Sequence, residues 1–127
     1  EAGTLLDQNI LPWQTQIGKP FIIGLSYPSS SNSATGCIPA GSGGCLDWTA
    51  LNRPNADIST VSLDLQQQVD IYEAVLTAIN TRSWVSGLVS RGYFEPVELQ
   101  DKSASIHGKP TRDLLWYWFP RLLGNIK

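Results

Sequence analysis

The sequence predicts an α/β protein whose parallel sheet is incomplete. Three segments with helical periodicity alternate with two short apolar runs, an order typical of parallel strands joined by crossover helices. The chain has 127 residues, of which 42% are hydrophobic, enough apolar mass for the core of one domain. Two strands alone would leave bare edges, so we expect another polypeptide to supply the missing strands.

The first predicted element is a helix over residues 5–17, where apolar residues recur at helical spacing. Pro12 would kink this helix or start its second half, and Gly18 followed by Pro20 marks its end. Residue 1 is glutamate and no signal segment follows it. We therefore interpret the chain as a processed product or a piece of something longer.

The first predicted strand covers residues 21–26, a continuous apolar run that is typical of a strand buried on both faces. Residues 28–60 form a long loop insertion rich in serine and glycine. Within it, glycines between Cys37 and Cys45 let the two Cα atoms reach disulfide distance. We predict a disulfide that shapes this loop over a cleft, in an extracellular or cell-surface setting; the alternative is two reduced thiols in a flexible loop.

The second half of the chain repeats the order of helix, strand, loop and helix. A helix begins near Ser62, with Asp64 close to its start. Its apolar face consists of Leu65, Val69, Tyr72, Val75, Leu76 and Ile79. A second strand covers residues 84–89, a loop covers residues 91–109, and a last helix begins at Pro110. We expect Trp116 and Trp118 of this helix to pack in the core or between helices.

Composition excludes several classes of partner. Nine Lys and Arg residues against eleven Asp and Glu give a net charge of −2, which argues against binding of nucleic acid or an anionic membrane. The longest apolar runs fall far short of the roughly 20 residues that span a bilayer. One His and two Cys exclude the usual zinc sites. We expect no metal and no cofactor.

Three segments resemble the C-terminal part of a (β/α)8-barrel (TIM barrel) glycoside hydrolase of clan A, which includes β-mannanases and β-1,4-galactanases. Residues 18–29 (GKPFIIGLSYPS) resemble the seventh strand, and residues 66–87 resemble the seventh helix leading into the eighth strand. Residues 101–110 (DKSASIHGKP) resemble the loop and opening of the eighth helix. The resemblance implies that residues 1–127 are a partial barrel, about strands 7 and 8 with helices 6 to 8, and that an N-terminal barrel half is a separate or cleaved polypeptide.

The resemblance also implies a retaining mechanism with two carboxylates, one nucleophile and one acid/base. Aligned through Tyr27 and Pro28, the nucleophile position falls on Gly24, and the acid/base would lie outside this chain. No catalytic residue is assigned here, and we expect this chain to be inactive alone. Whether the whole protein is an enzyme stays open.

Substrate binding is expected in the loops after the strands. Tyr27, Arg91 and Tyr93 lie at or just beyond strand ends, where aromatic faces stack on sugar rings and arginine donates to hydroxyls or carboxylates; the alternative is ordinary packing of loop residues. The predicted function is part of a secreted, glycoside hydrolase-like barrel that binds or processes polysaccharide. Two alternatives are a non-catalytic structural or glycan-binding component of an extracellular assembly, and a self-contained α/β module that dimerises.

Overall fold

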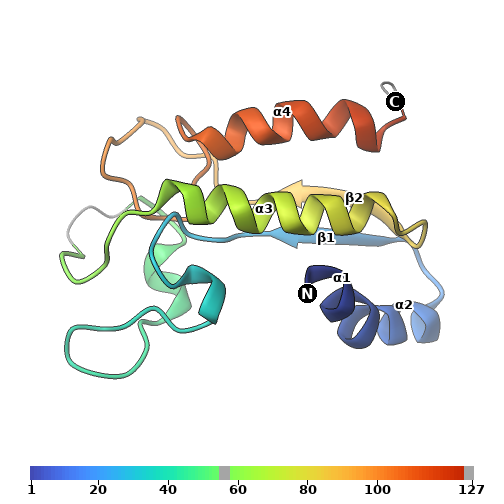
Figure 1. The fold of residues 1–127 in the computed structure, drawn as a ribbon, viewed down its shortest axis with the longest axis horizontal. Helices are drawn as coiled ribbons and strands as arrows, with labels where there is room; N and C mark the ends of the chain where they lie inside the picture. Colours follow the sequence, from blue (N-terminus) through green and yellow to red (C-terminus); the bar gives the residue numbers. More distant parts are fainter. Residues whose placement is uncertain (55–57, 125–127) are drawn as a thin grey trace.

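The fold is built around two parallel strands, joined by a helix that crosses one face of the sheet (Figure 1). The computed structural model describes residues 1–54 and 58–124. In chain order its elements are α1 (Ala2–Leu5), η1 (Leu6–Ile10), α2 (Leu11–Ile17), β1 (Phe21–Leu25), η2 (Ser33–Thr35), η3 (Trp48–Leu51), α3 (Leu65–Asn80), β2 (Val85–Ser90) and α4 (Pro110–Leu122). The predicted alternation of helices and strands is confirmed, and so is the parallel pairing of the two strands.

The N-terminal helical segment, α1, η1 and α2 together, ends where the sequence predicts. Gly18 adopts φ 63°, in the left-handed region, and donates its N–H to the Gln14 carbonyl at 2.8 Å. Pro12 lies in the first turn of α2, where its missing N–H costs no helical hydrogen bond. A π-helical turn, η1, precedes it.

The crossover helix α3 begins at an aspartate cap. The Asp64 side chain accepts a hydrogen bond from the Gln67 N–H at 2.9 Å, which satisfies one of the donors at the helix start. The helix therefore starts at Leu65 rather than at the predicted Ser62. It lies between α4 and the N-terminal helical segment in the view of Figure 1.

The core lies between one face of the sheet and the helices. Its larger cluster joins β1 to both long helices and consists of Leu25, Tyr72, Leu76, Ile106, Leu115 and Trp118. A smaller cluster of Leu6, Ala78 and Ile79 joins the N-terminal helical segment to α3. Ile23 and Leu88 pack against both clusters, so every helix of these clusters covers the same face of the sheet.

The opposite face of the sheet is open to solvent. Ile22 is 63% exposed and Val89 is 50% exposed, although both lie within strands. The prediction that both strands are buried on both faces is therefore wrong for this chain as described. Alternate strand residues point to opposite faces, and the helices cover only the face of Ile23 and Leu88. We call the open side, carrying Ile22, Gly24 and Val89, the inner sheet face.

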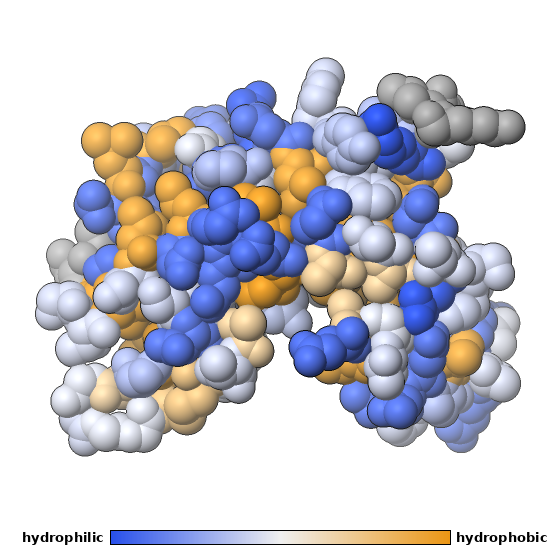
Figure 2. Space-filling view, in the orientation of Figure 1, coloured by the Kyte–Doolittle hydropathy of each residue, from blue (hydrophilic) through white to orange (hydrophobic). Residues whose placement is uncertain are grey.

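The insertion at residues 28–60 contains the predicted disulfide between Cys37 and Cys45, with a Cα–Cα distance of 5.1 Å. Two short 3₁₀ helices, η2 and η3, lie on either side of it. Figure 2 shows a notch on the face crossed by α3, between the insertion and the N-terminal helical segment. The insertion thus forms a lobe of its own beside the ends of the strands.

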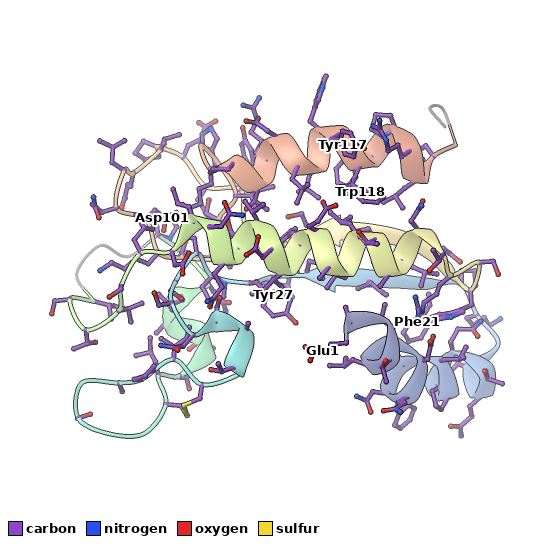
Figure 3. The ribbon with its side chains drawn as sticks, viewed as in Figure 1. Glu1, Phe21, Tyr27, Asp101, Tyr117 and Trp118 are labelled. Atoms are coloured by element: carbon purple, nitrogen blue, oxygen red, sulfur yellow. A yellow bond between two sulfur atoms is a disulfide. The ribbon has the colours of Figure 1, made fainter. Side chains whose placement is uncertain are left out.

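The two tryptophans of α4 differ in their surroundings. Trp118 is 8% exposed and belongs to the core, as expected from the sequence, and Figure 3 shows it on the side of α4 that faces α3. Trp116 is 81% exposed, which corrects the expectation that both pack inside. Two residues along an α-helix are about 200° apart around its axis, so only one of this pair can face the core.

Candidate functional site at the carboxyl ends of the strands

Both strands end at the same edge of the sheet, where the insertion and the loop of residues 91–109 gather (Figure 1). A pocket of about 480 Å³ opens there. Its polar lining consists of Ser26, Ser33, Asp47, Asn52, Arg53 and Arg91. Apolar side chains from the insertion and Phe94 from the loop complete the wall. Hydroxyl, amide and charged groups beside apolar surface are the lining expected of a small-molecule or sugar site.

The backbone of Arg91 is hydrogen-bonded to β1, whereas its side chain is exposed. Its N–H donates to the Leu25 carbonyl at 2.8 Å, which extends the pairing of the strands by one residue. A Cβ built on Gly24 would lie 3.7 Å from Arg91 Cδ, an ordinary van der Waals distance. The Arg91 side chain therefore passes beside the position where the resemblance expects a nucleophile.

Gly92 explains how the chain turns away immediately after Arg91. Its φ of 90° is rarely adopted by residues with a side chain, and a Cβ there would lie 2.9 Å from the Ala104 carbonyl oxygen. Its own carbonyl accepts a hydrogen bond from the Ile106 N–H at 2.9 Å. Residues 104–106 thus pack so close to position 92 that only glycine fits there. Their contact with Gly92 fixes the direction in which the chain leaves Arg91.

A buried ion pair closes the loop of residues 91–109. Asp101 Oδ2 lies 3.0 Å from Lys109 Nζ, and their side chains are 4% and 5% exposed. Asp101 Oδ1 also accepts from the Ser103 N–H at 2.8 Å, while Lys109 Nζ donates to the Ser103 carbonyl at 2.8 Å. Burial lowers the pKa of the Lys109 amine, and the hydrogen bond and charge of Asp101 oppose that shift. Figure 3 shows Asp101 in this loop, close to the carboxyl ends of the strands.

The same loop is tied to the insertion. The Ala104 N–H donates to the Leu51 carbonyl at 2.8 Å, and both residues line the pocket. Lys102 Nζ donates to the Ile58 carbonyl at 2.8 Å. The ion pair therefore supports the wall of the pocket that the loop of residues 91–109 forms. The two hydrogen bonds join this loop to the insertion, which forms the opposite wall.

Arg91 is the one residue of the three predicted sugar contacts that lines the pocket. Tyr27 is half-buried against the larger core cluster, at the position labelled in Figure 3, and its carbonyl accepts from Gln68 Nε2 at 2.7 Å. Tyr93 is 55% exposed, and its ring lies 4.3 Å from that of His107, centroid to centroid. Sugar contact by all three residues stays a prediction.

The insertion contributes pocket residues that sequence reasoning missed. Asp47 accepts hydrogen bonds from the N–H and the hydroxyl of Thr49, and these bonds hold the pKa of its carboxyl below the usual range. The Arg53 guanidinium lies over the Phe94 ring, 5.7 Å from its centroid. The predicted disulfide was the available signal, since a stapled loop over a cleft brings its own side chains to that cleft.

Within residues 1–54 and 58–124, no three His, Cys, Asp or Glu side chains are grouped so that they could hold a metal ion. No helix in the same part of the chain is both long and apolar enough to cross a membrane.

Comparisons with known proteins give a likeness of fold. No protein-family model matches the chain, and no curated protein matches it. Among solved structures, the chain is similar to one described as the complex structure of a GH113 β-1,4-mannanase, with a TM-score of 0.64 and 22% sequence identity. The similarity covers 93% of this chain and 34% of that one. The chain therefore shares the fold of one part of that enzyme structure and spans about a third of its length.

Proposed function

We propose that this chain is the C-terminal part of a secreted (β/α)8 barrel related to clan A glycoside hydrolases, and that it binds polysaccharide in the pocket at the ends of its strands. The observation that carries this proposal is the combination of the inner sheet face with a pocket at the carboxyl ends of the same strands. In a (β/α)8 barrel, helices cover the outside of the strands, and substrate binds in the loops at their carboxyl ends. The likeness to part of a β-1,4-mannanase structure supports the same arrangement.

The inner sheet face supports an N-terminal barrel half as the partner. Strand residues on this face would become the interior of the closed barrel, where branched apolar side chains pack in layers. Ile22 and Val89 are of that type and are at least half exposed here. Burying each such side chain fully is worth about 1.5–3 kcal/mol, so the open face favours association with the strands that complete the sheet.

Gly24 supports recognition rather than hydrolysis by this chain alone. It stands where the resemblance places the nucleophile, and its strand neighbours offer no carboxylate. The proposed role of the chain is therefore to bind sugar, with Arg91 in the pocket and Tyr27 and Tyr93 beside it. A non-catalytic glycan-binding component of an extracellular assembly is the second candidate, and the glycine at this position favours it.

We expect polysaccharide binding without turnover by this chain. The native material, its polypeptides first defined by intact mass, is applied to a glycan array that contains β-mannan, β-galactan and β-glucan. Reducing-sugar release is then measured for the native material and for the 127-residue chain separately. Binding by the native material with no release by the chain supports the proposal. A burst of reducing sugar from the chain alone, or no binding to any polysaccharide, contradicts it.

We expect charges on the inner sheet face to prevent assembly with the rest of the barrel. Ile22→Asp and Val89→Asp place a carboxylate where the closed barrel would be dry, whereas both sites are already exposed in this chain. Each variant should keep its circular dichroism spectrum and lose the companion polypeptide on co-purification. Leu99→Asp is the matched control, because Leu99 is 90% exposed and belongs to a loop rather than to either strand. A monomer that melts cooperatively and has no companion would instead support the self-contained module.

A further inference from the structure

We propose that the pocket at the ends of β1 and β2 takes an acidic saccharide, and that Arg91 binds its carboxylate or sulfate group. This inference rests on the proposed function of the pocket and names the class of sugar that it would bind. Among the described residues, two arginines and one aspartate line the pocket, in a chain whose net charge is −2. The positive charge is therefore a local property of this site.

The Arg91 guanidinium has unused donors. Its side chain makes no hydrogen bond and no ion pair with any residue in the described part of the chain, although its backbone is fixed to Leu25. Guanidinium groups carry five N–H donors in a planar fork that matches the oxygens of an anion. A fixed backbone with an unpaired fork is a suitable arrangement for a charged ligand group.

No carboxylate of the described residues forms an ion pair with Arg91. Gly24, beside the Arg91 side chain, has no side chain of its own. Asp47, the acidic residue among those that line the pocket, already accepts two hydrogen bonds from Thr49. The vacant space at Gly24 and the unpaired guanidinium next to it together favour an anion carried by the ligand.

The remaining lining suits the rest of a sugar. Ser26 and Asn52 offer hydroxyl and amide groups for ring hydroxyls, while Phe94 offers apolar surface for a ring face. Arg53 lies over Phe94 and brings a second guanidinium to the same pocket. A neutral sugar could use the polar and apolar groups but would leave the Arg91 fork unpaired.

The test compares tetrasaccharides that differ in charge. Titration calorimetry on the native material uses β-1,4-linked tetramannuronate, its neutral counterpart mannotetraose, and a sulfated mannotetraose. We expect at least one acidic tetrasaccharide to bind about tenfold to a hundredfold more tightly than the neutral one, the range for a charged hydrogen bond. The two acidic probes show whether a carboxylate or a sulfate is preferred.

Variants then assign the preference to Arg91. Arg91→Ala should remove it, and Arg91→Lys should keep part of it, because lysine retains the charge and lacks the fork. Arg112→Ala is the matched control, since Arg112 is exposed on α4 and outside the pocket. Gly24→Glu should pair with Arg91 internally and abolish binding of the acidic probes, whereas Gly24→Gln, of similar size, should not.

Each outcome separates this inference from the proposed function. Equal affinity for charged and neutral probes, or an acidic preference that survives Arg91→Ala, overturns the acidic-sugar inference while saccharide binding stands. Failure of the folded native material to bind any of the three probes or any polysaccharide on the array overturns both. If Arg91→Ala does not fold, the contrast between Gly24→Glu and Gly24→Gln decides the assignment.

Discussion

Replacing Lys109 with methionine is expected to destabilise the protein by about 3–5 kcal/mol, the usual cost of removing one partner of a buried ion pair. Asp101 is 4% exposed and would lose the ammonium group that lies 3.0 Å away. The Ser103 N–H would remain as a donor to it, but a neutral amide cannot replace the lost charge. The cost therefore comes from the uncompensated carboxylate rather than from a lost contact.

Urea unfolding followed by tryptophan fluorescence measures this effect. The double variant Asp101→Leu with Lys109→Met should recover much of the loss, because it leaves no buried charge unpaired. The pair of Arg82 and Asp7, at 2.7 Å, is the control, and Asp7→Ala should change stability less because the Asp7 side chain is 45% exposed and solvent screens its charge. Equal losses from Lys109→Met and Asp7→Ala would contradict the prediction.

This pair also bears on the candidate site. Lys109 and Asp101 lie at the base of the loop whose Ala104 lines the pocket and bonds to Leu51 of the insertion. Lys109→Met should therefore weaken the proposed sugar binding by the folded protein as well as lower its stability. Its charge is buried and bonded inside the protein, so it supplies no charge to the ligand.

The ends of the helices and the strands were largely predictable, because local chemistry decides them. Gly18 ends the first helix through its left-handed conformation, and Asp64 starts α3 through its side-chain hydrogen bond. The two apolar runs became strands within one residue of the predicted bounds, at Phe21–Leu25 and Val85–Ser90. Each of these features depends on residues close together in sequence.

The composition of the pocket was predictable only in part. Arg91 follows β2 directly, so the end of a strand was enough to identify it. Arg53 and Asn52 reach the same pocket because Leu51 of the insertion pairs with Ala104, more than fifty residues away in sequence. No local periodicity encodes such a pairing. The exposure of Ile22 was missed for a related reason, since a run of apolar residues shows that a strand has apolar faces and not what covers them.

Replacing Trp118 with alanine is expected to lower the free energy of unfolding by about 3–5 kcal/mol, whereas the same change at Trp116 should alter it by less than about 0.5 kcal/mol. Trp118 is 8% exposed, and its Nε1–H donates to a Glu73 carboxylate oxygen at 2.7 Å. Its removal leaves a cavity between α4 and α3 and an unpaired carboxylate. Removal of Trp116, which is 81% exposed, leaves no cavity and no unpaired carboxylate.

Because both substitutions remove an indole from the same helix, their difference reports burial and not helix propensity. Trp118→Phe should fall between them, since it fills most of the cavity and lacks the bond to Glu73. The core that Trp118 completes also contains Leu25, whose carbonyl binds the Arg91 N–H, so its loss should loosen the strand end that positions the pocket. Urea titrations measure the free energy of unfolding of the three variants. Similar decreases for Trp116→Ala and Trp118→Ala would show that α4 does not pack as described.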